Sequence, residues 1–522
     1  MRKNFLIRAL ALGLSFGALT AVPNFCDAQT VAVNEIVAVD LNFDASQGVE
    51  KTLFCDGQAV TFVAYENIFY VGKPASDMQK LSVYVPAEYL CGGTVNGYSA
   101  KTAPIFLPNG VGGYMPGEIL SPAEKDRMSG QPNASLVALS RGLVVVAPAI
   151  RGRTTEAEGK FVGKAPALIV DYKAAVRWLR FNRDRLPAGD VEKIISNGTS
   201  AGGALSAALG VTGNASEFAP YLDELAAANE RDDIFASNDY CPITNLENAD
   251  AAYEWIFADE TKYFPAMWQL QDWQARGVKK LSLPQKDKPL DADAANNPTA
   301  VKTAFEMTAE EISASKTLRA AFPAYVNGLN LRDGDGKPLT LDENGNGSFK
   351  EFIERKYIES AQSAVDRGED LSGVDWITIR NGRVVAVDLK KYPAAVTRMK
   401  AAPAFDKLDL SSAENDEFGT STNEPRHFST TLFSDKLADE KVIRMMNPLN
   451  FIGRADVTTA KHFRIRHGAA DRDTALAIPA ILALKLQSNG ANVDFFSPWA
   501  RGHGGDYDLP ELFDWIDAIC KN

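Results

Sequence analysis

Two parts of the chain alternate short apolar runs with longer segments of helical period. In the first part the apolar runs predict the following strands: 59–71, 81–85, 103–107, 143–149 and 191–196. The segment 165–186 repeats its apolar residues with the period of an amphipathic helix. Near the C-terminal end the pattern predicts strands at 462–466 and 492–496, and helices at 474–487 and 511–520. Because strands alternate with helices, we expect an α/β fold, a mostly parallel sheet flanked by helices.

Residues 241–445 interrupt this alternation. They are richer in charge, Asn, Pro and aromatic residues, and helical stretches such as 248–257 and 351–367 lack regular strand partners. Insertions of this kind often build substrate pockets above the strand ends. The predicted organisation is a sheet domain in two parts with a large inserted lid or substrate-binding domain: 29–240, 241–445 and 446–522, after a signal peptide at 1–28.

Composition and charge exclude some classes of binding partner. The chain has 522 residues, 45% hydrophobic and 23% charged, which is ample for a large soluble core. Its net charge of −12, without a basic stripe, argues against nucleic acid and against an anionic membrane surface. Nothing in the sequence indicates an oligomeric state.

The first residues have the pattern of a secretory signal. Arg2, Lys3 and Arg8 precede an apolar segment that runs from Ala9 to about Val22. The small Ala28 precedes the expected cleavage site. Cys26 raises the alternative of a lipoprotein, but the large Phe25 before it fits a lipid-attachment site poorly. The apolar run is short and interrupted by glycine, so we expect a secreted or periplasmic protein without a membrane span after cleavage.

Four cysteines follow the signal: Cys55, Cys91, Cys241 and Cys520. Cys55 could pair with Cys91, but a chain of this size needs no disulfide for its core. Free buried thiols are the equal alternative.

The stretch 198–202, Gly-Thr-Ser-Ala-Gly, contains the candidate nucleophile. It lies between the strand at 191–196 and a small-residue helix at 202–211, so Ser200 occupies a strand–turn–helix junction. The pattern G-x-S-x-G in this setting is the nucleophile elbow of the α/β-hydrolase fold. Small flanking residues are needed because the chain reverses sharply around the serine.

A serine hydroxyl needs a base and a group that orients the base, and the α/β-hydrolase fold supplies them in the chain order serine, acid, histidine. His503 lies in a Gly-rich loop after the last predicted strand, where the catalytic histidine belongs. The other histidines, His427, His462 and His467, are interpreted as hydrogen-bonded structural residues. Asp471 is the better candidate for the acid, whereas Asp473 could cap the helix that follows.

The oxyanion of the reaction needs two backbone N–H donors. Ala201, directly after the nucleophile, is one candidate. The second should come from the loop after the strand at 103–107, where Gly112 and Gly113 allow the backbone to approach a substrate. Together these features predict a serine hydrolase acting on esters or amides, which requires no cofactor.

Three segments resemble the bacterial tannases, tannin acyl hydrolases of the lactobacillus-type subfamily. They are 198–203, the run 464–473 that ends in Asp-Arg-Asp, and 503–508, His-Gly-Gly-Asp-Tyr-Asp. The resemblance covers nearly all of the chain after the signal, and it implies a triad of Ser200, Asp471 and His503 acting on a galloyl ester, a small-molecule substrate.

The resemblance also implies how the galloyl ring is bound. It places Asp473, with Lys400 and Glu414 from the insert, on the ring hydroxyls, and Ile243 against the ring face. Ala413 stands where the family has a proline. Buried polar partners would reject a ring without hydroxyls because they would stay unpaired. From the residues alone, Lys400 and Glu414 would be solvated surface charges.

Two alternatives on the same scaffold stay open, a feruloyl or general aryl carboxylesterase and, from another class, a non-catalytic phenolic-binding protein. The fungal type of tannase and feruloyl esterase has cysteines beside the serine and the histidine. Here the neighbours of Ser200 are Thr199 and Ala201, and His503 has glycines on both sides, which argues against the fungal type.

One further loop resembles the start of a calcium-binding EF-hand. Asp342, Asn344 and Asn346 place oxygen atoms at alternate positions before a glycine. The twelfth position is Ile353 rather than the bidentate Glu, so a turn without metal is the favoured interpretation and a structural calcium is the alternative.

Overall fold

The computed structural model describes residues 38–126, 129–266 and 304–521. The predicted signal peptide lies outside these residues. In the part that is described, no helix has both the length and the apolar character that a membrane crossing requires.

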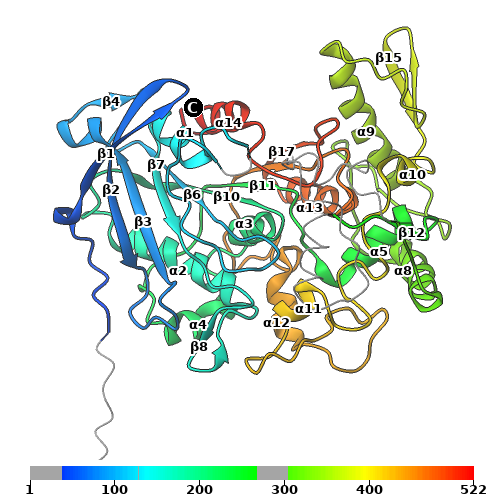
Figure 1. The fold of residues 1–522 in the computed structure, drawn as a ribbon, viewed down its shortest axis with the longest axis horizontal. Coiled ribbons are helices and arrows are strands. Elements are labelled where there is room, and N and C mark those ends of the chain that lie inside the picture. The colour runs from blue at the N-terminus through cyan, green and yellow to red at the C-terminus, as the bar shows by residue number, and fades with distance from the viewer. Residues whose placement is uncertain (1–37, 127–128, 267–303, 522) are drawn as a thin grey trace, which may run out of the picture. The chain divides into compact units, whose positions relative to one another are not determined.

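The described residues form a nine-stranded sheet (Figure 1). In spatial order its strands are β1 (Val49–Cys55), β2 (Gln58–Phe69), β3 (Lys80–Pro86), β7 (Val144–Pro148), β6 (Pro104–Pro108), β10 (Asp190–Thr199), β11 (Ala236–Tyr240), β16 (His462–Arg466) and β17 (Asn492–Phe496). The pairs from β1 to β7 are antiparallel, and those from β7 to β17 are parallel. Every residue of β6, β7 and β11 is buried, which requires cover on both faces. The predicted α/β-hydrolase architecture is therefore confirmed.

The helices lie at these bounds: α1 (Ala134–Ser140), α2 (Ala167–Phe181), α3 (Ala201–Val211), α4 (Ala219–Glu224), α5 (Leu246–Phe257), α8 (Ala309–Gly328), α9 (Ser348–Asp366), α10 (Tyr392–Val396), α11 (Ala413–Glu417), α12 (Glu440–Met446), α13 (Ala477–Ser488) and α14 (Leu509–Lys521). Within the sheet region α1 packs on α14, and α2 packs on α3 and β10. The strands and helices predicted from the pattern all occur, with ends that differ by a few residues.

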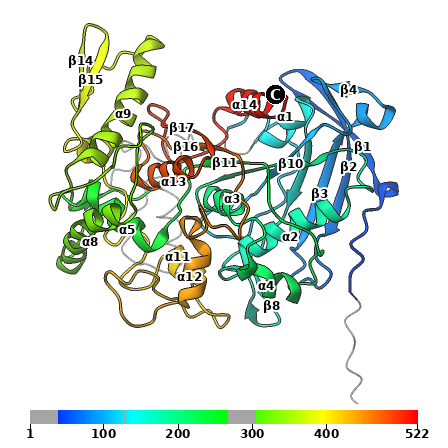
Figure 2. The ribbon, with the colours of Figure 1, turned by 180° about the vertical axis from the view of Figure 1, so that it is seen from behind.

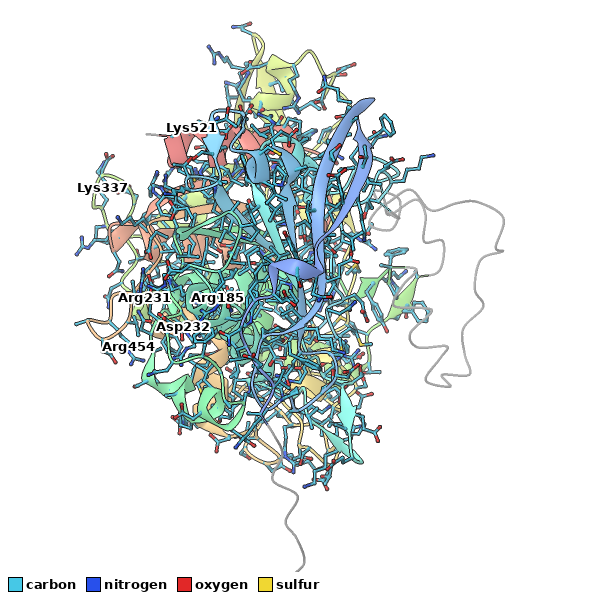
Figure 3. All side chains as sticks on the ribbon, turned by 90° about the vertical axis from the view of Figure 1, so that its left-hand side faces the viewer. Arg185, Arg231, Asp232, Lys337, Arg454 and Lys521 are labelled. Carbon is cyan, nitrogen blue, oxygen red and sulfur yellow. The ribbon has the colours of Figure 1, made fainter. Side chains whose placement is uncertain are left out.

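A buried network holds α2 to the loop before β11. Lys173 Nζ lies 2.7 Å from Asp232 Oδ1, and Arg177 Nε lies 2.8 Å from Asp232 Oδ2. Figure 3 labels Asp232 beside its neighbour Arg231. Since Lys173 and Asp232 are fully buried, each charge depends on the other for compensation.

The chain between β11 and β16 returns to the neighbouring strand of the same sheet after the long excursion that the sequence predicts as an insert (Figure 2). It contains α5 and α8–α12 with two two-stranded antiparallel sheets, β12 (Lys262–Tyr263) with β13 (Phe305–Glu306) and β14 (Ile377–Arg380) with β15 (Arg383–Val387). Two further pairs lie outside it, β4 (Thr94–Val95) with β5 (Tyr98–Ser99) and β8 (Glu156–Ala157) with β9 (Lys160–Phe161). Buried side chains of this segment, such as Phe349 and Phe405, belong to the same apolar core as the sheet.

The four cysteines after residue 38 are all free thiols, and only Cys91 is exposed. The sequence left a Cys55–Cys91 disulfide and free thiols as equal alternatives, and the structure shows free thiols.

Candidate active site

Ser200 occupies the sharp turn between β10 and α3. Its φ of 61° and ψ of −121° are values that a non-glycine residue adopts only where the surrounding structure imposes them. A side chain at Gly198 would collide with the Gly202 backbone, and one at Gly202 would lie 2.5 Å from the Val111 carbonyl oxygen. The two glycines of the motif are therefore required by packing, as the elbow interpretation predicts.

Asn109, which the sequence did not single out, ties the loop after β6 to the elbow. Its Nδ2 donates to the carbonyl oxygens of Asn197 and Gly202, both at 3.0 Å, and lies 3.1 Å from Ser206 Oγ. Its Oδ1 accepts from the Val111 amide at 3.2 Å. The loop that carries Gly112 and Gly113 is thereby held against the first turn of α3.

The predicted oxyanion donors lie in these two joined segments. Ala201 is the first residue of α3, where amides have no partner inside the helix. Within the described chain neither its amide nor that of Gly113 donates to another protein group. The Gly112 carbonyl accepts from the Met115 amide at 3.0 Å, which orients the same peptide group that carries the Gly113 N–H. The pair is thus available to an oxyanion.

His503 and Asp471 are in direct contact, as predicted. His503 Nδ1 donates to Asp471 Oδ2 at 2.8 Å. Asp471 Oδ1 accepts from the amides of Asp473 and Thr474, at 2.8 and 3.1 Å. Although burial alone would raise it, the charges of His503 and His467 hold the pKa of Asp471 well below its usual range. A permanently ionised Asp471 can both orient His503 and stabilise its positive charge.

The loop of His503 is packed against the elbow. Gly505 lies so close to Thr199, the residue before the nucleophile, that any side chain at 505 would overlap the Thr199 hydroxyl. Asn197 Nδ2 donates to Asp506 Oδ1 at 3.2 Å, which fixes the same loop to the end of β10. The elbow of Ser200, the loop of Asp471 and the loop of His503 thus meet at the carboxyl ends of β10, β16 and β17.

His467 and Cys241 also lie at the triad, which the sequence did not predict. His467 Nδ1 is 3.6 Å from Asp471 Oδ2, and in the described chain neither of its ring nitrogens makes a hydrogen bond. His467 is therefore not the hydrogen-bonded structural residue expected. His427, with its Nδ1 2.6 Å from Asp406 Oδ1, is one, and His462 Nδ1 bonds Asn492 at 3.3 Å.

Among the described residues, Cys241, His467 and Asp471 form one group that could hold a metal, with ligand atoms within 4.8 Å of one another. Although burial and Asp471 oppose it, the two histidines lower the pKa of Cys241 below its ordinary value. Because Asp471 already accepts from His503, a cation bound here would compete with the triad contact.

Lys400 and Asp473 form a buried ion pair beside the triad. Lys400 Nζ lies 2.9 Å from Asp473 Oδ1, and each side chain is 9% exposed. Burial by itself would lower the pKa of Lys400, but the carboxylates of Asp473 and Glu414 raise it. Burial raises the pKa of Glu414, and Lys400 opposes that rise. The interpretation of Lys400 as a solvated surface charge is therefore wrong.

The alternative role of Asp473 as a helix cap is also wrong. Helix α13 begins at Ala477, its N-cap residue is Leu476, and no side chain caps it. The Asp473 carboxylate instead faces Lys400.

Ile243 is buried, and its amide lies 3.4 Å from the Ser200 carbonyl oxygen, which places it next to the nucleophile. Glu414 is in the first turn of α11, and Ala413 is the residue with which that helix begins. Of the residues carried over from the family resemblance, Ile243 thus lies beside Ser200, and Lys400 and Glu414 of the insert lie near Asp473.

The loop of Asp342 is a self-contained turn. Asp342 Oδ1 accepts from the amides of Asn344 and Asn346, both at 2.9 Å, and Asn346 Oδ1 accepts from Lys350 Nζ at 3.0 Å. These bonds hold the loop as a tight turn just before α9.

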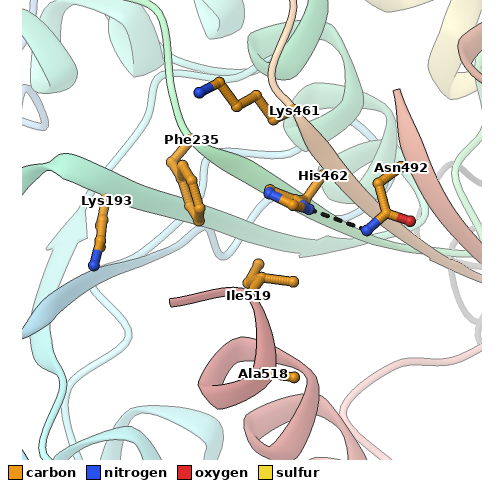
Figure 4. Close-up of a pocket in the computed structure, with 7 residues that line it drawn as sticks. All are labelled: Lys193, Phe235, Lys461, His462, Asn492, Ala518 and Ile519. Carbon is orange, nitrogen blue, oxygen red and sulfur yellow. Dashed lines mark hydrogen bonds between the residues drawn. The ribbon is translucent and has the colours of Figure 1, made fainter. Parts of the chain in front are cut away.

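A separate cavity of about 420 Å³ lies at the opposite ends of the strands (Figure 4). It is lined by Lys193, Phe235, Lys461, His462, Asn492, Ala518 and Ile519. His462 and Asn492 are the first residues of β16 and β17, whereas ligands of parallel sheets bind at the carboxyl ends. This cavity is therefore distinct from the site at Ser200.

Comparisons with known proteins agree with this geometry. A family model described as BD-FAE matches residues 123–274. The chain is 43% identical to a tannase from Lactobacillus plantarum, with a TM-score of 0.82 over 92% of this chain and 100% of that one. A Fusobacterium nucleatum tannase is 44% identical, with a TM-score of 0.83 over 92% and 99%. A tannin acyl hydrolase solved in complex with ethyl gallate is 43% identical, with a TM-score of 0.81 over 92% and 99%. No curated protein gives a significant match.

Proposed function

The chain belongs to the bacterial tannase family and is a carboxylic ester hydrolase, and from this premise we propose that it cleaves galloyl esters, both simple gallate esters and gallotannins, to gallic acid. The observation that carries the proposal is the buried Lys400–Asp473 pair beside the His503–Asp471 contact. A charged pair away from water is costly unless polar groups complete its hydrogen bonds, and the hydroxyls of a galloyl ring are such groups. The relative in complex with ethyl gallate supports this substrate class.

The proposed reaction proceeds through a galloyl-enzyme. Ser200 Oγ attacks the ester carbonyl while His503 Nε2 takes the hydroxyl proton, and the carbonyl π electrons move onto oxygen. The amides of Ala201 and Gly113, assisted by the freedom of the backbone at Gly112, stabilise that oxyanion. The intermediate collapses, the bond between the carbonyl carbon and the alcohol oxygen breaks, and His503 gives its proton to the leaving alcohol. Water, deprotonated by His503, then attacks the acyl carbonyl. The bond to Ser200 Oγ breaks, His503 returns the proton to that oxygen, and gallic acid leaves.

Recognition of the ring is assigned to the insert and to the loop after β16. Asp473 and Glu414 accept hydrogen bonds from ring hydroxyls, and Lys400 donates to a hydroxyl oxygen and offsets the two carboxylates. Ile243 packs against the ring face. A ring that lacks hydroxyls leaves these groups buried and unpaired, which is the physical basis of selectivity.

One comparison of rates tests the substrate. We expect methyl gallate to be cleaved with a higher kcat/KM than methyl ferulate, and p-nitrophenyl acetate to report the intact esterase machinery. Equal or faster cleavage of methyl ferulate refutes the galloyl assignment in favour of a feruloyl or general aryl esterase. Ser200→Ala should retain the fold and lose nearly all turnover, and a fluorophosphonate probe should label Ser200. Absence of labelling would favour the non-catalytic phenolic-binding alternative.

Export is a separate proposal. It rests on the basic and apolar pattern of residues 1–28 and is tested by expression of the whole chain in a bacterial host. We expect the mature protein outside the cytoplasm to begin at Gln29 by N-terminal sequencing. A full-length chain that stays in the cytoplasm would contradict it.

A further inference from the structure

Arg153 bridges the oxyanion loop and the helix that carries Glu414. Its Nε donates to the Gly113 carbonyl oxygen at 3.0 Å, and its Nη1 donates to Asp416 Oδ2 at 2.6 Å. Asp416 lies two residues after Glu414 on α11. One planar guanidinium therefore contacts both the residue proposed to donate to the oxyanion and the helix proposed to bind the ring.

Both ends of this bridge are sheltered from solvent. The Arg153 side chain is 10% exposed and that of Asp416 is 20% exposed. A second cation, Lys164, donates to Asp416 Oδ1 at 2.5 Å and to Asn423 Oδ1 at 2.9 Å, and in the described residues its ammonium has no hydrogen bond to Gly113. The two cations thus compensate the same carboxylate, but only Arg153 extends to the oxyanion loop.

The surrounding backbone makes the arrangement a rigid one. The Arg153 amide donates to the Tyr114 carbonyl oxygen at 2.8 Å, and the Ala165 amide donates to the Glu417 carbonyl oxygen at 3.0 Å. The segment 151–165 is therefore bonded to the oxyanion loop at one end and to α11 at the other.

Gly113 needs such support. Its φ is +54° and it has no side chain to pack. In the described chain its carbonyl accepts no hydrogen bond besides the one from Arg153. A glycine in this state has a wide choice of backbone conformations, so the placement of its N–H depends on the bonds to the two peptide groups that flank it. These are the bond from the Met115 amide to the Gly112 carbonyl oxygen and the bond from Arg153 Nε to the Gly113 carbonyl oxygen.

We propose that Arg153 is a positioning residue that, together with Asp416, fixes the oxyanion loop relative to the ring-binding helix α11. The groups that bind the galloyl ring and the N–H that donates to the oxyanion are then held in a fixed relation to each other by this bridge. This inference rests on the proposed roles of Gly113 and Glu414. Loss of the bridge leaves the ring site in place but displaces the N–H donor, so transition-state stabilisation falls while ground-state binding does not.

The decisive variant is Arg153→Lys, which keeps a cation facing Asp416 but cannot hold two acceptors with a rigid fork. Removal of a whole oxyanion donor costs about 10²–10³ in kcat, so a displaced donor should cost about 10- to 100-fold. We expect that loss on methyl gallate and on p-nitrophenyl acetate, with the inhibition constant of gallic acid changed by less than about twofold.

Asp416→Asn is the second variant, and the double variant should lose no more than about the larger single effect, because both changes break one connection. Lys164→Met is the matched control, since it removes the other cation from Asp416. It should lower Tm but leave kcat within about twofold of the unmodified enzyme.

Three results would overturn the inference. They are an unchanged kcat in Arg153→Lys, an equal kcat loss in Lys164→Met, or a rise in the gallic acid inhibition constant that matches the kcat loss. If Arg153→Lys fails to fold, the kcat loss of Asp416→Asn compared with that of Lys164→Met tests the inference. If the unmodified enzyme cleaves p-nitrophenyl acetate but not methyl gallate, the proposed substrate is wrong, and the acetate rates alone decide the role of Arg153.

Discussion

At the scale of single residues, the electrostatics of His503 determine where on the pH scale the enzyme works. Burial lowers the pKa of His503, but the carboxylates of Asp471 and Asp473 raise it well above the ordinary value. His503 must be neutral to accept the serine proton. We therefore expect kcat/KM to fall as pH is lowered, with a midpoint above that of an ordinary histidine, about 6.5.

Asp471→Asn removes the anion that causes most of this rise. The acid limb of the pH–rate profile should move to lower pH, and kcat should fall by about 10⁴ because the asparagine amide favours the wrong tautomer of the imidazole. The measurement is kcat/KM for p-nitrophenyl acetate from pH 4 to pH 9. A profile that keeps its midpoint in Asp471→Asn would show that Asp471 does not act on His503.

Asp506 in the same loop gives a second pH dependence, of stability. Burial raises its pKa to about 6. The unfolded chain releases this proton near pH 4, so the contribution to stability is full below that value and is lost as pH rises to about 6. Asp506→Asn keeps an oxygen for Asn197 and a residue type that tolerates the φ of 53°.

Urea denaturation at pH 4, 5, 6 and 7 measures the effect. Asp506→Asn should reduce the decline of the unfolding free energy across this window, whereas Asp514→Asn, at an exposed surface pair, should follow the unmodified protein. An unaltered slope in Asp506→Asn would contradict the assignment.

The site residues that could be predicted from the sequence are those that follow a recognisable strand in the chain order typical of the fold. Ser200, Asp471 and His503 follow three strand ends, and the strands are visible as apolar runs. Lys400 could be assigned only through the family resemblance, because nothing local shows that a charged residue 73 positions before Asp473 will meet it in the interior. His467 and Asn109 were missed for the same reason, since their importance lies in contacts across the fold.

At the scale of elements, the elbow works because α3 can approach the oxyanion loop closely. A methyl group at Gly202 would meet the Val111 carbonyl oxygen at 2.5 Å and Asn109 Oδ1 at 2.6 Å. We expect Gly202→Ala to push α3 from the loop and to lower both kcat and Tm. The matched control is Gly328→Ala at the end of α8, where a methyl group has no neighbour within 4 Å.

In that control the substitution removes only the helix penalty of glycine, so stability should rise by about 0.5–1 kcal/mol with kcat unchanged. Thermal unfolding and p-nitrophenyl acetate turnover of both variants are the measurements. Equal behaviour of the two variants would mean that the close approach at Gly202 is unimportant.

Strand β11 shows where the pattern of apolar residues cannot predict an element. Its sequence, Ala-Ser-Asn-Asp-Tyr, has no strand-like apolar pattern, yet all of it is buried. Two of its polar residues are paired across the sheet, Ser237 with Ser196 and Asn238 with Asn197, and Ser237 also donates to Asp239 of the same strand. At Ser237 and Asn238 hydrogen bonds to the neighbouring strand take the place of apolar burial, and such pairing is visible only after the strands are assembled.

At the scale of the whole molecule, ring recognition depends on how the insert is held. Arg398 and Glu254 form a fully buried ion pair, with Arg398 Nη1 2.8 Å from Glu254 Oε2. Arg398 Nε also donates to the Lys400 carbonyl oxygen at 2.5 Å. The pair therefore connects α5, at the start of the insert, to the segment that delivers Lys400 to Asp473.

Glu254→Gln leaves the buried Arg398 charge uncompensated, which should cost about 3–5 kcal/mol of stability. Because the Lys400 segment loses its support, KM for methyl gallate should rise, whereas p-nitrophenyl acetate, which has no ring hydroxyls, should be affected less. Asp259→Asn is the matched control, since it breaks the exposed pair with Arg319 nearby on the insert. That change should cost at most about 1 kcal/mol. Equal effects of the two variants on KM would show that Lys400 is positioned independently of the buried pair.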